Sequence, residues 1–271
     1  MSQDTTQDHI SKQVVVYRIP GMDDVKVLRD VEYRTSDAGA LTLDIYYPPE
    51  AKTGARRPTI VIVAGYPDAG FQKAVGCKFK EMGSSVSWGR LMAASGFAAI
   101  TYTNREPVTD IHALLEYVRQ NADPLGIDET RIGLWACSGN VPLALSALIG
   151  EAQGHLKCAA LCYGYMLDLG AATGVAEVAK AVGFVNPCAG NTVDDLPKQV
   201  PLFVARAGQD ELPHLNETLD RFLFEAVTRN LPVTFVNHAT APHAFDLLYD
   251  SEDTREIIKQ ILAFMRFHLL K

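Results

Sequence analysis

A strand meets a helix through a tight turn in the stretch Arg131-Ile-Gly-Leu-Trp-Ala-Cys-Ser-Gly-Asn140. A serine in such a turn has strained backbone and needs small neighbours, which Ala136 and Gly139 supply. The turn also places the next backbone N–H groups at a helix N-terminus, where an oxyanion is favoured. Ser138 is therefore a candidate nucleophile.

Strands and helices alternate on both sides of this turn. We expect early strands at Val14–Ile19, Val25–Tyr33 and Leu41–Tyr47, and later strands at Thr59–Val63, Phe97–Tyr102, Arg131–Ala136, Cys158–Tyr163, Pro201–Ala205 and Val233–Asn237. We expect helices at Trp88–Ser95, Asp110–Asn121, Val141–Ile149, Val175–Val182, Leu215–Thr228 and Glu252–Leu270. This alternation predicts an α/β fold with a mostly parallel central sheet, antiparallel strands at the N-terminal side and helices on both faces.

The length of 271 residues fits a single domain, 1–271. Apolar residues make up 48% and charged residues 21%, which is typical of globular proteins and excludes disorder as the dominant state. The segment 166–198 interrupts the alternation. It is either a small lid over the strand ends or an ordinary crossover helix with a long loop.

Charge and cysteine content narrow the function classes. A net charge of −7 disfavours nucleic-acid binding. The five cysteines lack zinc-ribbon spacing, so we expect free thiols and a reducing compartment. The first dozen residues lack the apolar core of a secretory signal, and no apolar run is long enough for a membrane span. We expect a cytoplasmic protein, with a homodimer left open as an alternative.

A serine nucleophile needs a base, and the base needs an acid that orients it. In a fold of this kind the chain order is serine, acid, histidine. Asp210 follows the strand Pro201–Ala205, and Glu211 beside it is the alternative acid. His243 lies between the last strand and the last helix and is the candidate base, with His238 as its competitor.

A second oxyanion donor is expected from the loop Ala64-Gly-Tyr-Pro-Asp68, which follows the strand Thr59–Val63. Gly65 permits close approach of the backbone, and Pro67 has no N–H. The N–H of Tyr66 is therefore the candidate donor. A weaker hypothesis places the Tyr66 hydroxyl against the leaving group.

The sequence resembles the α/β-hydrolase family, especially its dienelactone-hydrolase-like and small-esterase branches, from Leu41 to the final helix. The resemblance rests on Val63-Ala-Gly-Tyr66, Ser87-Trp-Gly-Arg-Leu-Met-Ala93, Arg131-Ile-Gly-Leu-Trp-Ala-Cys-Ser138, Ala207-Gly-Gln-Asp210 and Pro242-His-Ala-Phe245. It implies Ser138 as nucleophile, Asp210 as acid and His243 as base, with the N–H groups of Tyr66 and Gly139 as the oxyanion hole.

The chain departs from the family's G-x-S-x-G pattern, because Ala136 and Asn140 stand where glycines are typical. Ala64 likewise stands where many relatives have histidine. Cys137 is an alternative nucleophile, since the dienelactone branch typically uses cysteine.

These observations predict a serine hydrolase that cleaves small carboxylic esters through an acyl-enzyme, with no metal and no organic cofactor. The expected partner is a small ester, not a nucleic acid or a membrane. Two alternatives stay open: a thiol hydrolase that uses Cys137, and a non-catalytic binding protein on a hydrolase fold.

Overall fold

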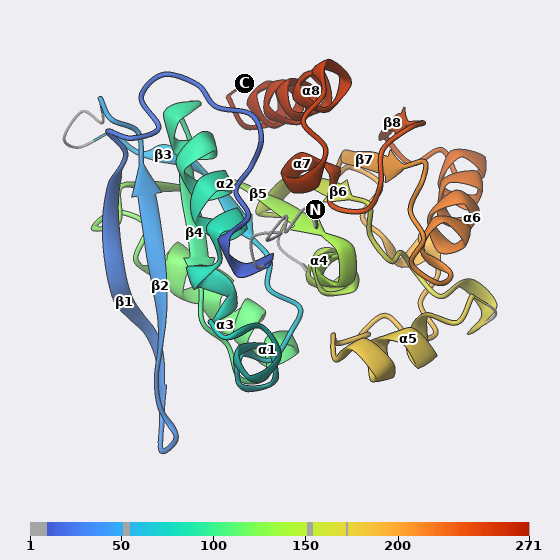
Figure 1. Cartoon of the computed structure of the whole chain (residues 1–271). Coiled ribbons are helices and arrows are strands. Elements are labelled where there is room, and N and C mark those ends of the chain that lie inside the picture. The colour runs from blue at the N-terminus through green and yellow to red at the C-terminus, as the bar shows by residue number, and fades with distance from the viewer. Residues whose placement is uncertain (1–9, 51–54, 151–153, 172, 271) are drawn as a thin grey trace, which may run out of the picture.

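The protein is represented by a computed structural model that describes residues 10–50, 55–150, 154–171 and 173–270 (Figure 1). Its eight-stranded sheet has the spatial order β1-β2-β4-β3-β5-β6-β7-β8. The strands are β1 (Lys26–Ser36), β2 (Gly39–Tyr47), β3 (Arg57–Ile62), β4 (Ala98–Tyr102), β5 (Ile127–Cys137), β6 (Leu156–Cys162), β7 (Leu202–Ala207) and β8 (Val233–His238).

The sheet is antiparallel only at its N-terminal side. β1 pairs with β2 and β2 with β4 in antiparallel fashion, whereas the pairs from β4 through β3, β5, β6 and β7 to β8 are all parallel. The predicted mostly parallel sheet with antiparallel N-terminal strands is confirmed. Because parallel strands end at one edge, the loops after β3, β5, β7 and β8 come together there.

Helices cover both faces of the sheet (Figure 1). The longer ones are α1 (Asp68–Val75), α2 (Gly83–Ala94), α3 (Pro107–Gln120), α4 (Val141–Ile149), α5 (Val175–Val182), α6 (Leu215–Thr228) and α8 (Glu252–Leu269), and α7 (Phe245–Leu248) is a single turn. Short 3₁₀ turns are η1 (Ile10–Lys12), η2 (Phe79–Glu81), η3 (Ser138–Asn140), η4 (Leu169–Ala171) and η5 (Val193–Asp195).

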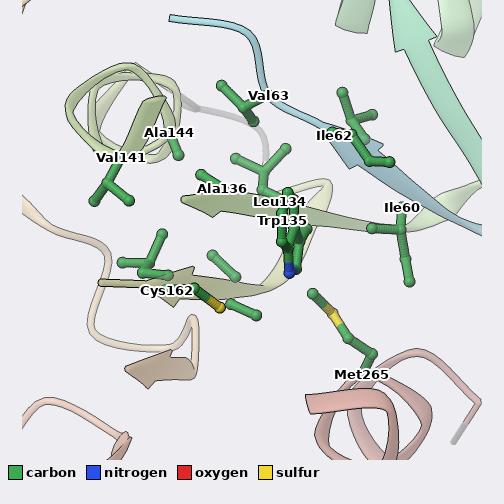
Figure 2. Close-up of a cluster of buried hydrophobic side chains, with 14 of the residues drawn as sticks. Ile60, Ile62, Val63, Leu134, Trp135, Ala136, Val141, Ala144, Cys162 and Met265 are labelled. Carbon is green, nitrogen blue, oxygen red and sulfur yellow. The ribbon is translucent and has the colours of Figure 1, made fainter. Parts of the chain in front are cut away.

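The main core lies around the central strands β3, β5 and β6. Figure 2 shows Val141 and Ala144 of α4 on one side of these strands and Met265 of α8 on the other. All three side chains are buried, as are Ile60 of β3 and Leu134 of β5 between them. The rings of Trp88 and Trp135 lie 4.6 Å apart, which places α2 against β5. This packing gives the turn after β5 a rigid base.

In the N-terminal half, one predicted strand was wrong and one helix was missed. The run Val14–Ile19 is not a strand, because its main chain bonds to two helices and not to a neighbouring strand. Val15 N–H donates to Ser87 Oγ of α2 at 2.9 Å, and Val16 N–H donates to the Asp246 carbonyl of α7 at 2.8 Å. Helix α1 was not predicted. Its sequence contains Gly70 and follows a loop rich in glycine and proline, which hides the helical pattern.

Candidate active site

Ser138 lies at the end of β5, where the chain turns into η3 and α4. Its φ of 55° falls in the left-handed region, which is strained for a residue other than glycine. Pro142 follows in the first turn of α4, where its missing N–H costs no helical bond. The strand and the helix hold this conformation between them and point the hydroxyl toward the carboxyl edge of the sheet.

A hydrogen-bonded relay joins three residues that are far apart in the sequence. His243 Nε2 lies 2.9 Å from Ser138 Oγ, and His243 Nδ1 lies 2.6 Å from Asp210 Oδ2. The Asp210 side chain is fully buried, and its Oδ1 accepts the Leu212 N–H at 3.0 Å. The carboxylate thus holds the imidazole in one orientation, with Nε2 facing the hydroxyl.

The two competing residues lie outside this relay. His238, at the end of β8, is buried with its Nε2 3.0 Å from Thr254 Oγ1 in α8. Burial lowers the pKa of this histidine. Glu211 is exposed, whereas Asp210 is directed inward. The structure therefore brings together Ser138, Asp210 and His243, as the chain order predicts.

The loop after β3 approaches the nucleophile turn closely. Ala64 N–H bonds to Tyr102 Oη at 3.2 Å, and Gly65 N–H bonds to Asn140 Oδ1 at 2.7 Å. A Cβ on Gly65 would lie 2.9 Å from Asn140 Cα, so only glycine fits there. Within the described residues, the Tyr66 N–H donates to no acceptor. This N–H is therefore available to a ligand at the turn.

Comparison with known proteins bears on the fold. No family model matches the chain, and no curated protein matches its sequence. Esterase B from Lactobacillus rhamnosis superposes with a TM-score of 0.68 at 16% identity, covering 92% of this chain and 86% of that one. A truncated carbohydrate esterase from gut microbiota gives 0.68 at 17% identity, covering 91% and 97%.

Esterase 2 from Thermogutta terrifontis, phosphonylated by sarin, gives a TM-score of 0.62 at 18% identity, covering 93% of this chain and 98% of that one. An α/β-hydrolase enzyme from a deep-sea metagenome library also superposes, with a TM-score of 0.64 at 18% identity, covering 91% and 99%. The chain has the α/β-hydrolase fold.

In this α/β-hydrolase fold, a cavity of about 220 Å³ opens beside Ser138. Most of its walls are apolar or aromatic, and α1, α2 and α7 contribute to them. The lining includes Ile10, Tyr66, Phe71, Val75, Phe79, Met82, Trp135, Tyr163, Ala244 and Leu247. None of the described lining residues belongs to 166–198, so the lid role of that segment stays a prediction.

The segment 166–198 instead packs against the loop after β3. Phe184 contacts the Tyr66 ring edge-on, with the ring centroids 6.0 Å apart, and stacks on Tyr165 at 5.2 Å. Val185 N–H donates to the Gly65 carbonyl at 2.9 Å. These contacts connect the chain that follows α5 to the candidate oxyanion donor.

A buried carboxylate beneath the site was missed by the sequence reasoning. Asp246 Oδ2 accepts the Trp88 indole N–H at 2.6 Å, and its Oδ1 accepts the Tyr163 hydroxyl. Burial raises the pKa of Asp246. The Tyr163 ring in turn meets the His243 ring edge-on at 5.0 Å. The only sequence signal was an acidic residue within the apolar run Ala244-Phe-Asp-Leu-Leu248.

Cys137 also lines the cavity, but its surroundings keep its thiol neutral. Burial raises its pKa to about 12, and the nearby Asp246 carboxylate acts in the same direction. Its Sγ lies 3.9 Å from Asn140 Nδ2, while the imidazole of His243 bonds to Ser138. Cys137 therefore has no hydrogen-bonded base among the described residues.

Two further kinds of feature are absent from the part of the chain that the structure describes. The described residues contain no group of three or more His, Cys, Asp or Glu side chains placed to hold a metal ion. They include no helix that is both long enough and apolar enough to span a bilayer.

Proposed function

We propose that this protein is a serine hydrolase that cleaves small carboxylic esters. The observation that carries the proposal is the bridge that His243 makes between Ser138 Oγ at 2.9 Å and Asp210 Oδ2 at 2.6 Å. A hydroxyl is a weak nucleophile until a base within hydrogen-bond reach removes its proton. The relay supplies that base and a buried carboxylate that orients it.

The first half of the proposed reaction forms an acyl-enzyme. Ser138 Oγ attacks the ester carbonyl carbon while its proton passes to His243 Nε2, and the carbonyl oxygen becomes an oxyanion. The N–H groups of Tyr66 and Gly139 stabilise this oxyanion; each such donor is worth about 10²–10³ in rate. The tetrahedral intermediate then collapses, and the leaving alcohol takes the proton from the imidazolium.

The second half releases the acid. A water attacks the acyl carbon and gives its proton to His243 Nε2. Collapse of the second tetrahedral intermediate returns the proton to Ser138 Oγ and frees the carboxylic acid. Asp210 keeps the imidazole in one tautomer and stabilises its positive charge in both halves. His243 moves every proton, so the reaction as written needs no cofactor.

The cavity beside Ser138 supports a small apolar substituent on the ester. Its volume of about 220 Å³ and its aromatic and aliphatic walls favour a short alkyl or aryl group. We place the chain nearer the small esterases than the dienelactone-hydrolase branch. A cysteine nucleophile would have to be Cys137, and its raised pKa disfavours the thiolate.

A panel of p-nitrophenyl esters of increasing acyl length tests the proposal, with wild type, Ser138→Ala and Cys137→Ala compared. We expect short esters to turn over in wild type and Cys137→Ala, and kcat to fall by about 10⁶ in Ser138→Ala. A fluorophosphonate probe followed by peptide mapping should label Ser138. Label on Cys137 would establish the thiol hydrolase, and absence of both turnover and label would favour the binding protein.

A further inference from the structure

Asn140 stands at the position where the nucleophile motif carries its second glycine. Asn140 is only 3% exposed to solvent. Its Oδ1 accepts the Gly65 N–H at 2.7 Å, and its Nδ2 donates to the Cys137 carbonyl at 3.0 Å. One amide group therefore connects the loop after β3 to the main chain that precedes Ser138.

The Gly65 carbonyl is held separately by the Val185 N–H at 2.9 Å. A peptide unit is planar and trans, so the Gly65 C=O and the Tyr66 N–H point in opposite directions. A bond that fixes this carbonyl also fixes the direction of the Tyr66 N–H. The Asn140 bond fixes the preceding peptide unit in the same way.

Gly65 needs this restraint because glycine has the freest backbone of any residue. It cannot be replaced by a stiffer residue, since a Cβ would lie 2.9 Å from both Asn140 Cα and the Gly139 carbonyl oxygen. The close approach of the two loops thus requires glycine at position 65. The bonds of the Gly65 carbonyl to Val185 N–H and of the Gly65 N–H to Asn140 Oδ1 restrict its backbone. An asparagine can do this because its amide carries an acceptor and a donor, whereas glycine has no side chain to offer.

We propose that Asn140 is a positioning residue that holds the Tyr66 N–H in place for the oxyanion, acting through Gly65. This inference rests on the ester hydrolysis proposed above. At the second glycine position of the G-x-S-x-G pattern, this chain thus has a side chain that connects the two elements of the proposed oxyanion hole. These elements are the loop that carries the Tyr66 N–H and the turn that carries the Gly139 N–H. Restoring the glycine would remove the Asn140 bonds to the Gly65 N–H and to the Cys137 carbonyl, and so loosen the donor.

The test compares Asn140→Gly and Asn140→Ala with wild type on a short p-nitrophenyl ester. We expect kcat to fall by about 10²-fold with KM changed by less than about threefold, because a shift of about 1 Å in a catalytic group has an effect of this size. A trifluoromethyl ketone, which forms an oxyanion on Ser138, should lose affinity by a similar factor. A non-hydrolysable ether of the same shape should bind as before.

Asn121→Ala is the matched control, because Asn121 Nδ2 donates to the Tyr117 carbonyl at 2.9 Å at the end of α3, away from the cavity. It should lower thermal stability without changing kcat. Rates are expressed per active site titrated with a phosphonate, so unfolded protein does not count. Asn140→Ser, whose hydroxyl is too short to bridge both partners, replaces the other two variants if they do not fold.

A wild-type kcat in Asn140→Gly would overturn the inference. So would a fall in kcat with unchanged ketone affinity, because that combination reports a general structural defect. Either result in an active wild-type enzyme leaves the proposed esterase function standing. By contrast, a wild type that hydrolyses no ester and is not labelled at Ser138 refutes the function itself.

Discussion

Replacing Gly139 by alanine tests how closely the loop after β3 packs on the turn that carries Ser138. A Cβ at this position would overlap Tyr66 Oη and lie 2.7 Å from Phe184 Cδ1. Both rings pack against other rings: Tyr66 contacts Phe71 and Phe184, and Phe184 stacks on Tyr165. Gly139 has no positive φ, so the effect is steric and not one of backbone strain.

The magnitude follows from the displacement. The rings must retreat by roughly 1 Å to reach ordinary contact, and a shift of that size in a catalytic group costs about 10²-fold in rate. We therefore expect kcat/KM to fall by about 10²-fold, equivalent to about 2.7 kcal/mol of transition-state stabilisation. Overpacking should also destabilise the fold by about 1–3 kcal/mol.

The assay is steady-state hydrolysis of a short p-nitrophenyl ester together with urea unfolding. Gly70→Ala is the matched control, because a Cβ there meets nothing within 4 Å and Gly70 lies in helix α1. It should keep its activity and gain up to about 1 kcal/mol of stability from helix propensity. A Gly139→Ala enzyme with wild-type kcat/KM would refute the packing argument.

Three further outcomes are expected. His243→Ala should lower kcat by about 10⁶, whereas His238→Ala should keep kcat and lose about 1 kcal/mol of stability with its hydrogen bond; equal kinetic losses would contradict the assignment of the base. Burial raises the Cys137 pKa from 9.0 to about 12, so the stability gained by burying the neutral thiol is complete below pH 9 and is lost as the pH rises toward 12. The urea midpoint should fall above pH 9, and less steeply in Cys137→Ala; parallel curves would contradict this. Trp88→Phe keeps the apolar ring but removes the donor to Asp246, so unfolding should become easier by about 1–3 kcal/mol, and a loss too small to measure would show that this bond is not needed.

The sequence predicted the sheet well because buried parallel strands read as continuous apolar runs. Helices α4 and α6 begin and end at the predicted residues, Val141–Ile149 and Leu215–Thr228. The prediction of a strand at Val14–Ile19 was wrong for a physical reason. The β-branched residues of this run favour extended backbone, but a strand also needs a neighbouring strand, and this segment bonds to α2 and α7 instead.

The three relay residues were predictable because chain order and position after a strand constrain them strongly. Asn140 was visible only as a departure from a motif, and one of its two bonds is to a loop 75 residues away in the sequence. Asp246 could not be recognised either, since its partners Trp88 and Tyr163 come from distant elements. Local pattern therefore identifies the residues of the relay better than the residues that hold them in place.

The bond between Val16 N–H and the Asp246 carbonyl limits when the molecule can complete its folding during synthesis. It joins one of the first described residues to a turn just before the last helix, and Asp246 itself lies beneath His243. Contacts between such distant segments form late, because a long loop must close first. During synthesis this contact can form only after the segment up to Asp246 has left the ribosome, so its formation reports the folding of the segment from Val16 to α7 as one unit.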